Sequence, residues 1–228
     1  MAYNRPGMKG IWTKQKYNAA ALAILFFAVV LRLIGFQDVP PGLVRDEVLN
    51  ADIVEFIRNG QHALFFREGF GHEPLYHYFG VPFQILLGDN ALAIRYPSII
   101  LGMLLTALSI PWAKRLTGSR TAALLTALGL AIGWWPIIFS RIGLRAISLP
   151  VLLLLAHYAW MRGRPMQSAL WIGLSFYTYT AARVMLALPI LLFVDAVFLG
   201  WAGGGGRQGF SGVKAQRRER FLVDYLWF

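Results

Sequence analysis

The sequence contains no cysteine, and charged residues make up only 14% of its 228 positions. The missing thiols exclude a disulfide framework and a thiolate metal site. Because so little charge is combined with 57% hydrophobic residues, an ordinary soluble globule is excluded as well. Acidic residues are half as frequent as basic ones, since 11 acids face 22 basic residues and leave a net charge of +11. These shortages together predict a membrane protein.

Apolar runs recur along the chain at a length that crosses a bilayer, which is about 20 residues. They predict an all-α integral membrane protein with about six transmembrane helices, at residues 18–36, 91–113, 121–139, 146–161, 168–179 and 184–201. Only "TAAR" separates the fifth and sixth runs, so a tilted hairpin or a partly re-entrant pair is the alternative there. The expected organisation is a basic N-terminus at 1–17, a transmembrane domain at 18–202, and a Gly-rich linker with a basic tail at 203–228.

The basic residues indicate how the chain is oriented in the membrane. If the first run crosses outward, 14 of the 22 basic residues and all five lysines fall on one side. The positive-inside rule makes that side the cytoplasm, so both termini are expected there. The charge is thus explained without a nucleic-acid partner. The first run is long and lacks a cleavage site, which predicts a retained anchor in the cell (inner) membrane, crossed several times by the chain.

The outer side has a different composition. Its eight basic residues are all arginines, and eight of the eleven acids accompany them. Because guanidinium binds phosphate in a planar fork, this composition favours an outer pocket for a phosphate. Arginines that anchor helix ends at the membrane interface are the alternative.

A long outer segment, residues 37–90, is too polar to cross the membrane and too long for a simple loop. Apolar residues follow a helical period from Glu47 to a stop at Gly60, and a second helical stretch covers 74–87. We therefore expect two amphipathic helices that lie on the outer membrane surface.

Four motifs in order carry a family resemblance: "VPPGLVRDEVLNADIVEFIRNG", "GHEPLYHYFGVPFQILLGDNALAIRYPS", "FSRIGLRAISLP" and "GLSFYTYTAARVMLALP". From about residue 39 to 192 the chain resembles the N-terminal half of the family 39, protein O-mannosyltransferase-like, membrane glycosyltransferases. The resemblance implies the C-type glycosyltransferase fold, with an Asp-Glu pair on the surface helices of the first outer loop. It also implies transfer of a sugar from a polyprenyl-phosphate carrier to an acceptor on the outer side. We expect no cofactor and no metal.

The resemblance implies a role for each matching residue. Asp46 corresponds to the family's catalytic aspartate and Glu47 to its partner. Arg141 and Arg145 correspond to the basic residues of the second outer loop, and with Arg183 they are the expected ligands of the carrier phosphate. The residues expected to line the substrate are Glu73, Tyr76, Tyr177 and Tyr179.

The chemistry of such a transfer agrees with these roles. Sugar transfer from a phosphate needs a base that takes a proton from the acceptor hydroxyl, and cations that stabilise the phosphate as it leaves. Asp46 can supply the base. Arg141 and Arg145 are four residues apart at an expected helix start, which predicts that they share one face and supply the cations.

Each of these residues also has a plainer interpretation. Asp46 can be the N-cap of the helix that it precedes, with Glu47 favouring the positive end of the helix dipole. The arginines can be interfacial anchors, and the tyrosines an aromatic belt. His72 and His77 near Glu73 have weak spacing for a metal, so loop polarity is the favoured interpretation. Two ionisable residues inside apolar runs, His157 and Asp195, are expected to turn inward toward partners that the sequence does not identify.

The chain departs from the family pattern in two respects. Family members are usually about twice as long, and many carry an acid just after the arginines of the second outer loop, where this chain reads "RAISLP". A second hypothesis is therefore a shortened relative without catalysis, which serves as an accessory or scaffold subunit in a larger membrane protein complex. The expected partners are the lipid bilayer and either a polyprenyl-phosphate sugar or other membrane subunits.

Overall fold

The computed structural model of the protein describes residues 13–184. The chain divides into two units after Thr180, and only the first four residues of the second unit are described. Within 13–184 the secondary structure is helical, apart from an isolated antiparallel bridge between Phe66 and His72. The elements are α1 Lys14–Leu33, α2 Arg45–Arg58, η1 Glu68–Phe70, α3 Leu75–Leu87, α4 Ala91–Thr117, α5 Arg120–Ile132, α6 Trp134–Arg141, η2 Arg145–Ile147, α7 Ser148–Met161, α8 Pro165–Ser175 and η3 Thr180–Arg183.

Two of these helices, α1 and α4, are long and apolar enough to cross a membrane. A third crossing is possible if α5 and α6, which meet at an angle of 52°, form one bent span. The fourth and fifth predicted runs form α7 and α8, helices of only 14 and 11 residues, and the sixth, 184–201, lies outside the described residues except for its first position. Within residues 13–184 the structure therefore supports an all-α protein with two or three candidate spans, and the count of six stays a prediction.

The third predicted span, residues 121–139, is broken where its sequence reads "GWWP". Gly133 is extended there, and a Cβ on it would lie 2.7 Å from the carbonyl oxygen of Gly129. Pro136 in the first turn of α6 has no N–H to continue the helical bonds across the break. The apolar run is continuous in the sequence, but the helix is interrupted at Gly133.

Arg32 stabilises this break. Its guanidinium is fully buried and donates to the carbonyl oxygens of Leu130 at 3.0 Å and Ala131 at 3.3 Å, and its Nε donates to Ser140 Oγ at 3.1 Å. Carbonyls at a helix end have no partner in lipid unless a side chain supplies one. Arg32, in the last turn of α1, is thus an internal cap for a broken helix.

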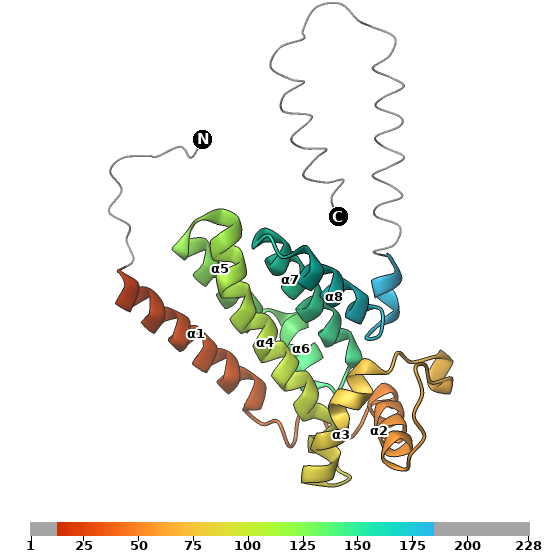
Figure 1. Ribbon diagram of the computed structural model, residues 1–228. Helices are drawn as coiled ribbons and strands as arrows, with labels where there is room; N and C mark the ends of the chain where they lie inside the picture. The colour runs from red at the N-terminus through yellow and green to blue at the C-terminus, as the bar shows by residue number, and fades with distance from the viewer. Residues whose placement is uncertain (1–12, 185–228) are drawn as a thin grey trace, which may run out of the picture. The chain divides into compact units, whose positions relative to one another are not determined.

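Helix α4 is the centre of the bundle. It begins after Asn90, whose side chain accepts from the Ala93 N–H at 3.0 Å, and it ends at Gly118, whose φ of 70° suits glycine. The helix contacts α1, α3, α5, α6 and α7 (Figure 1).

The expected partner of His157 lies on α4, since the Trp112 Nε1–H donates to His157 Nδ1 at 3.0 Å. Asp195 lies outside the described residues.

The two helices predicted for the outer segment are both present. Helix α2 buries Ile53, Val54 and Ile57 against α3, as its pattern predicts. Helix α3 has the opposite polarity, because it buries its polar residues and exposes an apolar set. The buried polar residues are Tyr76, His77 and Gln84, and the exposed apolar residues are Phe79, Ile85, Leu86 and Leu87. A helix with this polarity suits lipid outside and polar protein inside.

Candidate functional site

The Asp46–Glu47 pair lies in the first turn of α2, which begins at Arg45 after the N-cap Val44. Glu47 is the third residue of the helix, and its Oε2 accepts from the Val44 N–H at 3.0 Å. This is the return bond of a capping box. The interpretation of Asp46 as the N-cap is therefore wrong, because Glu47 performs the capping.

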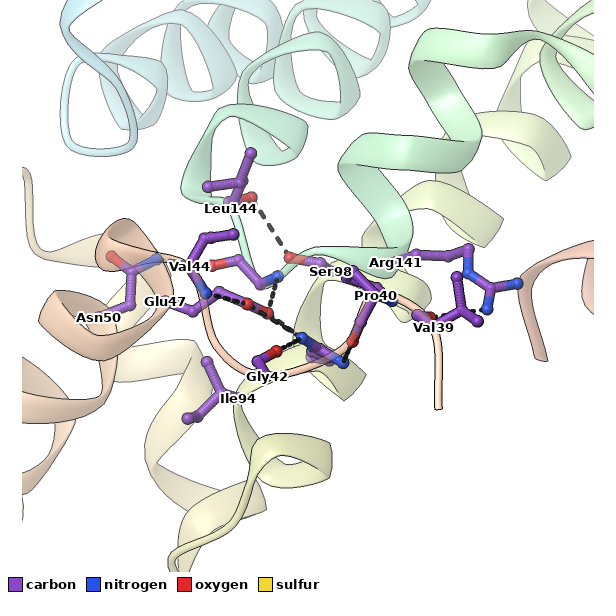
Figure 2. A network of polar contacts seen from close by, with 12 residues as sticks. Val39, Pro40, Gly42, Val44, Glu47, Asn50, Ile94, Ser98, Arg141 and Leu144 are labelled. Atoms are coloured by element: carbon purple, nitrogen blue, oxygen red, sulfur yellow. Dashed lines mark hydrogen bonds and ion pairs between the residues drawn. The ribbon is translucent and has the colours of Figure 1, made fainter. Parts of the chain in front are cut away.

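Glu47 also forms a fully buried ion pair with Arg95 of α4. Arg95 Nε lies 2.7 Å from Glu47 Oε1, Arg95 Nη2 lies 3.1 Å from Oε2, and both residues are at most 1% exposed. Figure 2 shows the polar contacts that gather around Glu47. Glu47 Oε1 accepts a further hydrogen bond from the Gly143 N–H at 3.0 Å. With two hydrogen bonds on each oxygen, this carboxylate has no acceptor site left for a further hydroxyl group.

The buried pair holds four separate segments together. Arg95 of α4 donates to the carbonyl oxygens of Pro40 and Gly42 as well as to Glu47, so it fixes the loop before α2. Gly143 belongs to the link between α6 and η2, and a Cβ there would lie 2.8 Å from a side-chain atom of Ile94. The first turn of α2 is consequently fixed against the loop before it and against the α6–η2 link, and Asp46 with it.

Asp46 itself is exposed, unlike its neighbour. Within residues 13–184 its carboxylate makes no hydrogen bond or ion pair. It lies close enough to His72 to oppose the shift of that residue's pKa, which is lowered by burial first and by the charge of Arg145 second. A carboxylate that is accessible and rigidly placed beside a polar cluster has the geometry that a general base requires.

The polar cluster beside Asp46 is built around Glu73 and Arg145. Arg145 Nη1 lies 2.6 Å from Glu73 Oε2, its Nη2 donates to the Gly71 carbonyl at 3.2 Å, and its guanidinium carbon lies 5.5 Å from the centroid of the Tyr179 ring. The Thr180 hydroxyl donates to the other oxygen of Glu73 at 3.0 Å. Three predicted site residues, Glu73, Arg145 and Tyr179, are thus brought together.

A buried histidine pair lies under this cluster. His72 Nδ1 is 3.3 Å from His77 Nε2, and His77 also contacts Asn50 Oδ1 and the Glu73 carbonyl, each at 3.0 Å. Asn50, four residues after Asp46, donates to the Gly143 carbonyl at 2.6 Å. The sequence does not identify Asn50 as a site residue. Its only distinguishing feature is a polar amide on the buried face of α2. Residues 13–184 hold no group of three or more His, Cys, Asp or Glu that could bind a metal.

The histidine pair predicts a loss of stability in acid. Burial, with the nearby charge of His72 second, lowers the pKa of His77 to about 3. The folded state therefore favours the neutral ring, and this stability is complete above about pH 6.5 and is lost as the pH falls toward 3. At pH 5 we expect a loss on the order of 2 kcal/mol. Thermal unfolding of the wild type and of His77→Asn at pH 7.5 and at pH 5 measures this loss of stability. If the variant lost as much stability between the two pH values as the wild type, His77 would not be its source.

Arg141 does not join Arg145. Helix α6 ends at Arg141, and the extended residues Ile142 and Leu144 separate it from η2. The Arg141 guanidinium donates instead to the carbonyl oxygens of Ile34 and Val39, both at 2.8 Å, and so holds the end of α1. The prediction that the two arginines share one helical face is wrong, because no helix is continuous between them.

The other predicted site residues lie in different surroundings. Tyr76 is buried, and its hydroxyl is 2.7 Å from Ser98 Oγ, so it packs between α3 and α4. Tyr177 is 45% exposed, and its carbonyl accepts from the Leu75 N–H at 2.8 Å. Arg183 belongs to the second unit and is not described together with the site of the first.

An apolar pocket of about 300 Å³ opens on the bundle next to the short helix η2. It lies beside the break between α5 and α6 and shares this short helix with Arg145. Its lining is Leu105, Leu130, Trp135, Pro136, Phe139, Ala146, Ile147 and Pro150. The volume is at the lower end of the range for ligand pockets, and the lining contains no charged side chain.

Comparison with protein-family models, with curated proteins and with solved structures found no match to this chain.

Proposed function

We propose that this protein is a membrane glycosyltransferase that moves a sugar from a polyprenyl-phosphate carrier to an acceptor on the outer face, with Asp46 as the base. One observation carries the proposal: the exposed carboxylate of Asp46 is fixed by the buried Glu47–Arg95 pair beside the Glu73–Arg145 cluster. The proposal includes a multi-pass chain of about six spans in the cell membrane, with both termini in the cytoplasm.

In the proposed reaction the site residues have separate roles. Asp46 takes the proton of the acceptor hydroxyl while that oxygen attacks the anomeric carbon. The bond from this carbon to the phosphate oxygen breaks, and its electron pair leaves with the phosphate. Arg145, oriented by Glu73, stabilises the charge that develops there. Glu47 acts as a positioning residue and does not transfer a proton.

The location of the apolar pocket supports a lipid-linked substrate. Ala146 and Ile147 line the pocket, and Arg145 begins the same short helix η2. A phosphate at Arg145 could therefore continue into a hydrocarbon chain in the pocket. Both the base and the cation belong to segments next to helices that are apolar enough to span a membrane.

Filling this pocket is expected to weaken binding of the carrier. A Leu130→Trp variant would exclude about three methylenes of the chain, at roughly 0.8 kcal/mol each, and raise the KM for the carrier about 50-fold with little change in kcat. The matched control is Leu125→Trp on the same helix, because Leu125 is exposed and outside the pocket. Steady-state kinetics with purified protein measures the KM for the carrier in both variants. Equal KM values for Leu130→Trp and Leu125→Trp would show that the pocket does not hold the carrier.

The second hypothesis, an accessory subunit without catalysis, also has an observation in its favour. Arg145 is already engaged by Glu73 at 2.6 Å, and Trp134 and Trp135 are 72% and 66% exposed beside the broken span. Exposed aromatic residues on such a helix suit packing against partner helices as well as against lipid.

Native mass spectrometry of the protein, taken from its own membranes in mild detergent, separates the two hypotheses. A lone chain that carries a bound polyprenyl-phosphate lipid is the result expected for the transferase. A fixed set of partner subunits without that lipid would overturn the transferase and favour the accessory subunit.

A further inference from the structure

The acids of residues 13–184 lie at one end of the bundle. All eight acids in residues 13–184 fall between positions 38 and 89, in the outer segment with α2 and α3. The start of α1, the α4–α5 turn and the α7–α8 turn lie together at the opposite end of the bundle (Figure 1). These three places carry seven basic residues, which we call the inner rim: Lys14, Lys16, Lys114, Arg115, Arg120, Arg162 and Arg164. Within 13–184 the inner rim is thus a surface of a single charge sign.

Two cations of the inner rim converge on one aromatic ring. Lys114 Nζ lies 5.3 Å from the centroid of the Tyr17 ring, and the Arg120 guanidinium carbon lies 5.7 Å from it. They come from the end of α4 and the start of α5, and Gly118, with a φ of 70°, makes the tight turn between them. Three helices, α1, α4 and α5, therefore form this junction.

The junction is well packed. Tyr17 is only 8% exposed and packs with Ile110, Ala113, Ala123 and Leu124 in a shared core. Attraction to the ring face holds both cations in place, although their mutual repulsion opposes it. The N-terminus of α5 adds the positive end of its dipole at the same place. An anionic group at the junction would relieve this repulsion.

The position of the junction identifies the class of anion. It lies at the ends of α1 and α4, the two helices that are apolar enough to cross a membrane, and therefore at the depth of lipid headgroups. Basic pockets between transmembrane helices on the cytoplasmic side bind anionic lipid headgroups. A lipid phosphate fits both the charge and the depth, whereas nucleic acid fits only the charge.

We propose that Lys114 and Arg120, held over Tyr17, form a binding site for the phosphate headgroup of an anionic inner-leaflet phospholipid. The site is at the opposite end of the bundle from Asp46 and does not depend on the transferase activity.

The test is a titration of the full-length protein in mild detergent with phosphatidylglycerol or phosphatidylcholine, read by native mass spectrometry. Lys114→Gln/Arg120→Gln is expected to weaken phosphatidylglycerol binding about 30-fold, at roughly 1 kcal/mol per cation. Arg162→Gln/Arg164→Gln removes the same charge from the same rim and is expected to keep the affinity. The charge-conserving Lys114→Arg/Arg120→Lys variant is expected to bind within about threefold of the wild type, and it also checks folding.

Three results would overturn the proposal. Equal losses in the two glutamine variants would mean that only the total charge of the rim matters. Equal binding of the two lipids by the wild type would remove the role of headgroup charge. Tighter binding of a single-stranded oligonucleotide than of phosphatidylglycerol would assign the rim to nucleic acid.

Discussion

Asp46→Asn is expected to abolish sugar transfer while the protein remains folded. The amide has nearly the same shape but cannot accept the proton of the acceptor hydroxyl, and general base catalysis contributes about 10²- to 10⁴-fold. The fold should survive, because Asp46 is exposed and makes no hydrogen bond within residues 13–184. The loss should appear in kcat with little change in the KM for the carrier, measured with polyprenyl-phosphate sugar and purified protein.

Asp52→Asn is the matched control for this experiment. Asp52 lies on the same helix, is also exposed, and makes the same change in net charge when it is replaced. We expect it to retain wild-type turnover. If Asp46→Asn kept its turnover as well, the proposed base would be wrong, and the accessory subunit would become the better hypothesis.

The sequence predicted the elements of the outer segment well, because local signals define them. Apolar periodicity marked α2, and the glycines at 60 and 88 follow the ends of α2 and α3. Side-chain partners were not predictable in the same way. Glu47 and Arg95 are 48 residues apart, and neither residue carries a local signal of the other. Only the packing of α2 on α4 brings them together, so the local sequence at a helix start can indicate a cap but not a buried ion pair with a distant residue.

Composition also failed where backbone geometry overrides it. Residues 121–139 have the hydropathy of a span, yet a single extended glycine and the following proline divide them into α5 and α6. The same kind of break separates Arg141 from Arg145, which a helical period had placed on one face. Hydropathy indicates whether a segment can be buried in lipid or in a protein core. Whether its helix is continuous depends on a few residues, such as glycine and proline, with special backbone conformations.

Breaking the Glu47–Arg95 pair is expected to have the largest effect on stability. Glu47→Ala leaves Arg95 buried without its carboxylate and removes the acceptor for the N–H groups of Val44 and Gly143. Removal of one partner of a buried ion pair costs about 3 to 5 kcal/mol. We expect a fall in Tm on the order of 10 °C in detergent, together with loss of any transfer activity, because Asp46 would no longer be held in place.

A double-mutant cycle separates the pair from its neighbours. Glu47→Ala/Arg95→Ala should be less destabilised than the sum of the two single variants, since the double variant leaves no unpaired buried charge. Asp89→Ala provides the exposed comparison, because the side chains of Arg58 and Asp89 are 31% and 67% accessible and their 2.6 Å contact should contribute less than about 1 kcal/mol. A loss for Glu47→Ala as small as that for Asp89→Ala would mean that the buried pair does not hold the outer loops. Asp46 would then have no rigid support, and it would not be a positioned base even if the residue itself were essential.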